Sequence, residues 1–132
     1  LLGVDLEKDE DVLHAAYNDA AGVTAKFNMN LLARMNRELG ADFDLSAFHH
    51  DAIYNRDAHR IEMHLVSDKP QKVHLGGRTI GFAANESIHT ENSYKYSVAR
   101  LRALAERSGW TLETSWTDKD GMFSVHALRA VG

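Results

Sequence analysis

The sequence predicts an α/β fold in which the two ends of the chain share one sheet and an α+β domain is inserted between them. Three observations support this prediction. The chain opens on a short apolar run, Leu1–Leu6, which is typical of a buried strand. Apolar residues then recur with helical spacing up to Gly40, and short strand-like runs separated by turn formers extend from His49 to Ala83. The last third returns to one helix followed by two alternating strands.

Two helices are expected before the strand-rich block. Asp9 can cap a first helix that buries Leu13 and its apolar neighbours Val12 and Ala16. The second helix has the clearest pattern in the chain, with Thr24 as the expected N-cap and Gly40 as the C-cap glycine. Its apolar stripe takes every fourth position, with Leu32 beside it: Phe27, Leu31, Met35 and Leu39.

The block from His49 to Ala83 predicts a small antiparallel sheet. Four runs have strand character: residues 52–54, 60–66, 72–75 and 79–83. Gly76-Gly77, between the last two runs, is a hairpin signal. A helix is then expected from Ser97, its N-cap, to Gly109, and two strands follow, Trp110–Trp116 and Met122–Ala130.

Composition and charge exclude several classes of protein. The formal net charge of −4, with both signs interspersed, argues against a general nucleic-acid binder, which needs clustered Lys and Arg. There is no cysteine, so disulfides, thiol catalysis and thiolate metal sites are excluded. No apolar run is long enough to span a bilayer, and Leu1–Leu6 is too short for a signal peptide. We therefore expect a cytoplasmic chain, and the start on Leu1 suggests a sequence entered partway.

The eight histidines raise the question of a metal site. His64 lies two residues from Glu62, so a strand would place both on one face, but no HExxH pattern is present. Solvated or hydrogen-bonded histidines are the better interpretation, and no metal is expected. No glycine pattern of a nucleotide-binding or cofactor-binding loop occurs, so no cofactor-binding residue is expected within the chain.

The segment Ile88–Tyr96, IHTENSYKY, has the highest density of polar chemistry in the chain. Glu91 and Ser93 are two residues apart, so in extended backbone they face the same way. A carboxylate can only accept hydrogen bonds, whereas a hydroxyl can donate or accept them. Such a pair suits a ring with two nitrogens, such as imidazole. A polar segment that only precedes and caps a helix explains the same spacing about equally well.

Six collinear stretches resemble the L-histidine Nα-methyltransferases of ergothioneine biosynthesis, which use S-adenosylmethionine. The stretches are Leu1–Asp9, Ala15–Leu32, Asn36–Asp44, Arg60–Ser67, Ile88–Tyr96 and Trp116–Leu128. They run from end to end of the chain, which makes them more specific together than any one alone.

The resemblance implies roles for five residues that match the family's motifs. Glu91 and Ser93 would hold the substrate imidazole, and Tyr17 would contact the substrate carboxylate. Phe27 and Met63 would help to wall the pocket. The family's glycine-rich S-adenosylmethionine loop has no counterpart here, so the cofactor would be bound mainly by residues upstream of Leu1. No residue is named as a general base, since a neutral amine can attack directly.

The resemblance also implies an architecture: the C-terminal part of a class I, Rossmann-like methyltransferase. Residues 1–6 would be a strand of its sheet, residues 7–90 a substrate-binding insertion, and residues 91–132 the closing helix and terminal hairpin. The expected function is recognition of L-histidine for trimethylation of its α-amino group to hercynine, with the N-terminal half of the same protein as partner. Alternatives are a non-catalytic histidine-binding module, a split subunit, or a methyltransferase for another amino acid such as tryptophan.

Overall fold

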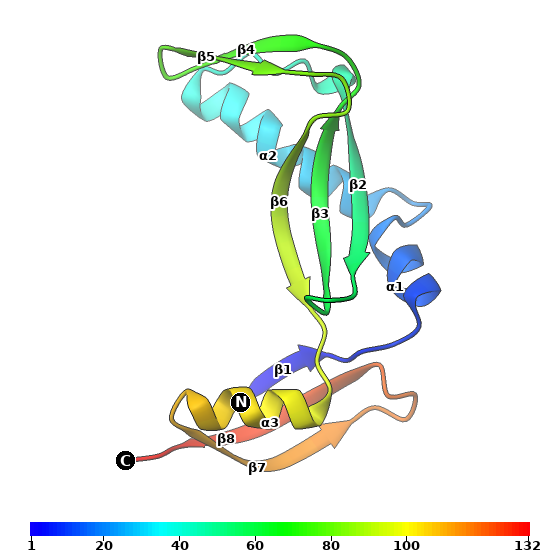
Figure 1. The fold of residues 1–132 in the computed structure, drawn as a ribbon, viewed down its shortest axis with the longest axis vertical. Helices are drawn as coiled ribbons and strands as arrows, with labels where there is room; N and C mark the ends of the chain where they lie inside the picture. The colour runs from blue at the N-terminus through cyan, green and yellow to red at the C-terminus, as the bar shows by residue number, and fades with distance from the viewer.

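The computed structural model describes residues 1–132 as two lobes joined by a narrow waist (Figure 1). We call residues 1–6 and 95–132 the small lobe; it contains both chain termini. Residues 7–94 form the large lobe. The chain crosses between the lobes twice, once after β1 (Leu2–Asp5) and once after β6 (Ser87–Tyr94). No helix has the length and apolar character needed to cross a membrane.

The small lobe is a three-stranded antiparallel sheet with the order β1-β8-β7. The predicted terminal hairpin is confirmed as β7 (Trp110–Thr117) and β8 (Phe123–Ala130). The predicted N-terminal strand is confirmed as β1, which pairs with β8. Its other backbone edge pairs with no further strand and is met only by Tyr96, at Asp5 and Glu7. The helix α3 (Val98–Arg107) covers the sheet, and the buried core between them comprises Val4, Leu6, Leu101 and Leu112.

The large lobe has a three-stranded antiparallel sheet with the order β2-β3-β6. It consists of β2 (Phe48–Asn55), β3 (Arg60–Ser67) and β6. The prediction of one sheet over residues 49–83 was wrong, because β4 (Gln71–Leu75) and β5 (Arg78–Phe82) form a separate hairpin. Its turn uses the predicted Gly76-Gly77, both at positive φ, where a glycine lacks the clash of a Cβ.

Strand β6 was missed because its sequence has no hydrophobic alternation. Most of its side chains are exposed, and the strand forms because β3 offers a pairing edge rather than because its own apolar residues require burial. The strand also runs across the expected domain boundary between residues 90 and 91. The chain leaves the large lobe at Lys95, where the backbone N–H donates to the carbonyl of His59 at 2.8 Å.

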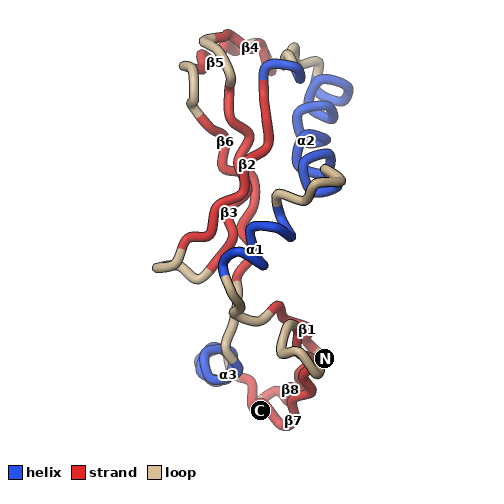
Figure 2. The backbone as a smooth tube through the Cα atoms, turned by 90° about the vertical axis from the view of Figure 1, so that its right-hand side faces the viewer, coloured by secondary structure: helices blue, strands red, loops and turns tan.

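The helices α1 (Glu10–Tyr17) and α2 (Val23–Leu39) lie on one face of the β2-β3-β6 sheet (Figure 2). Asp9 caps α1 as predicted, and its carboxylate accepts from the N–H of Asp11. Thr24 is not the N-cap of α2. The helix starts after Gly22, and the carboxylate of Asp19 accepts from the backbone N–H groups at the first turn.

The buried face of α2 also differs from the one that was expected. Asn28 and Leu32 are buried, whereas Phe27 is 65% exposed and Leu39 61% exposed. The line of contact with the sheet runs through Asn28 and Leu32, and Met35 of the expected stripe packs against the same core. The rest of that stripe lies at the margin of the contact. In α1, similarly, Leu13 is buried but Val12 and Ala16 are not. Between α2 and the sheet lies the short 3-10 helix η1 (Leu45–Ala47), capped by Asp44.

Two separate cores hold the large lobe together. One lies under α2 and the β4–β5 hairpin and comprises Leu32, Phe43, Phe48, Leu65 and Val73. The other lies under α1 and comprises Leu13, Ala52, Ile61 and Met63, with Tyr17 packed against it. The second core places the C-terminal end of α1 against the part of the sheet next to the waist.

Candidate functional site

Tyr17 and Ser93 meet on the helix-covered face of the sheet. Tyr17 is the last residue of α1, and Ser93 is the penultimate residue of β6. Their hydroxyl oxygens lie 2.7 Å apart, a hydrogen bond in which either group can donate. The structure therefore brings together two of the five residues expected to contact the substrate.

Lys95 completes this group, and sequence reasoning did not assign it a role. Its ammonium donates to the Tyr17 hydroxyl at 2.7 Å and to the Ser93 hydroxyl at 2.8 Å. The same nitrogen lies 2.8 Å from a carboxylate oxygen of Asp5 in β1, and the Lys95 side chain is 0% exposed. The signal was available in the spacing, because Glu91, Ser93 and Lys95 recur every second residue.

Asp5 is the carboxylate that compensates the buried Lys95 charge. Partial burial alone would raise the pKa of Asp5, but hydrogen bonds from Lys8 and Lys95 and their positive charges outweigh it and lower this pKa. Asp5 is therefore ionised at neutral pH. The pair joins the small lobe, through β1, to the hydroxyl groups of the large lobe.

Glu91 lies on the same face, one step further along β6. It is opposite Met63 in β3, at a register shift between Met63 and His64 that leaves Thr90 as an extra residue. The Thr90 hydroxyl donates to the side chain of Asn28 at 2.6 Å, which ties this irregular point of the strand to α2. Glu91 itself is exposed.

A pocket of about 200 Å³ lies between α2 and this part of β6. Phe27 and Glu91 both line it, together with Asn28, Asn30, Leu31, Arg34 and Thr90. Met63 is buried in the core against which Tyr17 packs, so it supports the site from below rather than lining this pocket. All five expected residues thus lie on one face of the lobe, with Tyr17 and Ser93 in direct contact and Phe27 farther along, beside Glu91.

The opposite face of the sheet gathers Glu62, His64 and His89, with one potential ligand atom from each within 4.8 Å of the others. Glu62 already accepts from Arg60 and Asn55, and the His89 ring is hydrogen-bonded to Asn92 at 2.8 Å. The rings of His64 and His89 stack at 4.7 Å. All three groups have protein partners, His64 through the Ser87 hydroxyl at 3.3 Å, so the arrangement is explained as a hydrogen-bonded network of side chains.

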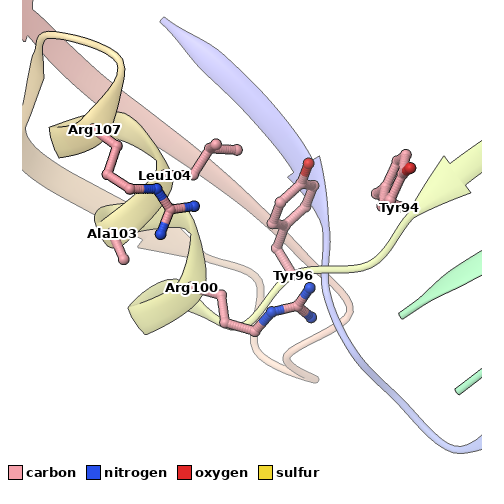
Figure 3. A pocket seen from close by; sticks show the side chains of 6 residues that line it. All are labelled: Tyr94, Tyr96, Arg100, Ala103, Leu104 and Arg107. Atoms are coloured by element: carbon pink, nitrogen blue, oxygen red, sulfur yellow. The ribbon is translucent and has the colours of Figure 1, made fainter. Parts of the chain in front are cut away.

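A second pocket, of about 320 Å³, lies at the waist and is drawn in Figure 3. It is bounded by Tyr94, Tyr96, Arg100, Ala103, Leu104 and Arg107. Arg100 donates to Glu7 at 2.5 Å and to the carbonyl of Lys95 at 3.2 Å, so its charge is used in holding the two lobe crossings together. Leu104 is 38% exposed and lines this pocket.

Comparison with known proteins identifies the family of this chain. Residues 1–130 match the model of a family described as histidine-specific, SAM-dependent methyltransferases, and the chain belongs to this family. It is similar to the histidine N-alpha-methyltransferase of Mycolicibacterium smegmatis, with 46% identity over 127 residues, which are 95% of this chain and 40% of the relative.

Two further relatives agree with this placement. The histidine N-alpha-methyltransferase of Mycobacterium tuberculosis is 45% identical over 127 residues, with the same coverage of 95% and 40%. Ergothioneine biosynthesis protein 1 of Schizosaccharomyces pombe is 23% identical over 129 residues, 97% of this chain and 17% of that protein. The chain spans 40% of the length of the two bacterial relatives.

Proposed function

We propose that this chain is the substrate-recognition portion of an S-adenosylmethionine-dependent methyltransferase that trimethylates the α-amino group of L-histidine. The observation that carries the proposal is the contact between Tyr17 and Ser93 at 2.7 Å, with Glu91 two residues before Ser93 on the same face. A carboxylate and a hydroxyl so placed can hold the two nitrogens of an imidazole. A ring without those nitrogens would leave both groups unpaired, which rejects it more strongly than an apolar wall could.

The remaining candidate residues complete the pocket in this proposal. Phe27 is 65% exposed on α2 and offers an aromatic wall next to Glu91, while Met63 fixes the floor beside Tyr17. Tyr17 would contact the substrate carboxylate. The network of Lys95 and Asp5 would hold these groups in place between the lobes.

In this proposal the cofactor side of the reaction lies in a preceding segment of a longer parent protein. The position of β1 at the edge of its sheet supports it, since the part of its outer edge before Asp5 offers unpaired N–H and C=O groups to a neighbouring strand. The small lobe would then be the closing part of a class I, Rossmann-like sheet. S-adenosylmethionine would supply the electrophilic methyl group, while this chain orients the substrate amine toward it.

The chemistry needs little from this chain beyond positioning. The lone pair of the neutral α-amine would form the new N–C bond to the methyl carbon. The bond between that carbon and the sulfonium sulfur would break, and the electron pair of this bond would stay on sulfur. Before each further transfer the methylated amine loses a proton to solvent. No residue of the chain needs to act as a general base.

A substrate panel on the full-length parent tests the proposal. The protein is incubated with S-adenosylmethionine and L-histidine, L-tryptophan or L-phenylalanine, and products are analysed by mass spectrometry. We expect one, two and three added methyl groups on histidine and little product from the others. Preferred methylation of tryptophan would refute the imidazole assignment. Histidine binding without any methylation would instead indicate a non-catalytic binding module.

A further inference from the structure

We propose that Lys95 is a positioning residue that fixes the Ser93 hydroxyl as a hydrogen-bond donor, so that the site binds the neutral form of the substrate imidazole. This inference rests on the proposed function. It concerns a residue that touches no substrate atom and acts through Ser93 and Tyr17.

The first step follows from the donor capacity of the lysine. An ammonium group has three N–H donors and no acceptor. In the structure all three have partners: a carboxylate oxygen of Asp5, the hydroxyl of Tyr17 and the hydroxyl of Ser93. Both hydroxyl oxygens must therefore accept from Lys95, and the burial of the lysine leaves no water to take over either bond.

The second step concerns the hydrogen shared by the two hydroxyls. Tyr17 and Ser93 lie 2.7 Å apart, so one of them donates to the other. A phenol is the more acidic hydroxyl and the better donor, whereas an aliphatic oxygen is the better acceptor. When Tyr17 donates, Ser93 accepts from both Tyr17 and Lys95. Both lone pairs of the Ser93 oxygen are then occupied, and its hydrogen is the only group left to offer a ligand.

The third step combines this donor with Glu91, whose carboxylate can only accept. A neutral imidazole has one N–H for Glu91 and one lone pair for Ser93. An imidazolium has two N–H groups and no lone pair, so it would face the Ser93 hydrogen with a hydrogen of its own. The structure thus favours the neutral ring although a carboxylate by itself would favour the charged one.

The charged and titratable groups around Ser93 come from several neighbouring elements. Asp5 and Lys8 lie on the far side of Lys95, Tyr17 on α1, and Glu91 on β6 itself. At the waist, Glu7 is paired with Arg100 and with His59. Asp5 balances Lys95, and Arg100 and His59 engage Glu7. Arg34 of α2 lines the same pocket as Glu91 and is paired with Glu38, so Glu91 is the charged group at the pocket that has no ion-pair partner.

The test measures histidine binding to the full-length parent by calorimetry between pH 8 and pH 5.5. In the wild type, affinity should fall as pH drops below about 6.5, the ordinary imidazole pKa, approaching tenfold per pH unit. Lys95→Met should lower affinity at pH 8 by about tenfold, the loss of one oriented hydrogen bond. It should also flatten the pH dependence, because Ser93 can then accept from an imidazolium. Lys8→Met, which leaves the Lys95 bonds to both hydroxyls in place, is the control and should keep the wild-type slope.

A second measurement requires no variant, in case Lys95→Met does not fold. Nitrogen-15 NMR of bound histidine labelled in the ring distinguishes the neutral ring from the imidazolium. We expect a neutral ring at pH 6, with one protonated nitrogen and one that is not. A bound imidazolium, or an unchanged slope in folded Lys95→Met, would overturn the inference and leave the proposed function standing. Absence of histidine binding at every pH would overturn both.

Discussion

The hydroxyl oxygens of Tyr17 and Ser93 lie 2.7 Å apart although 76 positions separate them in the chain. The contact forms because the core of Leu13, Ala52, Ile61 and Met63 fixes the end of α1 against the face of the sheet, while β6 pairs with the edge of β3 that lies away from β2. One hydroxyl therefore comes from a helix and the other from a strand. Lys95 links both to Asp5 in the small lobe. The two hydroxyl groups proposed to contact the substrate and the joint between the lobes are parts of one hydrogen-bond network.

Glu91→Ala in the full-length parent should raise the KM for histidine by about tenfold to a hundredfold, since a hydrogen bond to a charged group contributes roughly 1.5–3 kcal/mol. Glu91→Gln should have a smaller effect, because the amide oxygen still accepts from an imidazole N–H. Steady-state kinetics at fixed S-adenosylmethionine measure both. Glu113→Ala, at an exposed position of β7, is the matched control and should behave like the wild type. An unchanged KM in Glu91→Ala would remove Glu91 from the pocket.

Asp5→Ala should destabilise the protein by about 3 kcal/mol, because it leaves the fully buried Lys95 without a counter-charge. Urea unfolding at pH 7 measures this loss, with the exposed Asp57→Ala as control.

The lowered pKa of Asp5 also predicts that the stability of the protein depends on pH. The folded-state pKa of Asp5 is lowered, so its stabilisation is fully present above the unfolded pKa of about 3.9 and is lost as pH falls through the folded pKa. Asp5→Asn should therefore lose less stability than the wild type below about pH 4. Parallel acid-unfolding curves for the two proteins would contradict this account.

His126 should make the small lobe sensitive to mild acid. The ring is fully buried, and its nitrogens are hydrogen-bonded to Ser115 at 2.8 Å and to Ser124 at 2.7 Å. Burial lowers the pKa of His126, so the unfolded chain binds a proton at higher pH than the folded one. Its contribution is complete above about pH 6.5 and is lost as pH falls through the lower folded-state pKa. Thermal unfolding of His126→Gln should show a weaker pH dependence between pH 7 and pH 5, while the exposed His14→Gln should retain that of the wild type.

Leu32→Ala should destabilise the large lobe by about 3 kcal/mol, because Leu32 is 0% exposed in the core under α2 and its removal leaves a cavity. Leu39→Ala, in the same helix but 61% exposed, should change the free energy of unfolding by less than about 0.5 kcal/mol. Denaturant unfolding of both variants measures the difference. Equal losses would mean that the every-fourth-residue stripe, and not the line through Asn28 and Leu32, is the buried face of α2.

Local patterns predicted the elements whose formation depends on neighbouring residues. The C-cap at Gly40, the Gly76-Gly77 turn, the Ser97 cap and the terminal hairpin all follow from short-range backbone chemistry. The family resemblance also follows from the sequence, because six collinear motifs do not depend on knowing how they fold. The motifs alone thus predicted the class of protein and named as candidates Glu91, Ser93, Tyr17, Phe27 and Met63.

Tertiary structure decided what depends on pairing between distant segments. Strand β6 has no hydrophobic alternation, and it forms because it pairs with an edge of β3. The start of α2 after Gly22 depends on the carboxylate of Asp19, which accepts from the N–H of Val23. From sequence alone a lysine such as Lys95 is expected at the surface, because an ammonium group is buried only when its N–H donors have partners. Those partners lie on β1, α1 and β6, and only the packed fold brings them to one point.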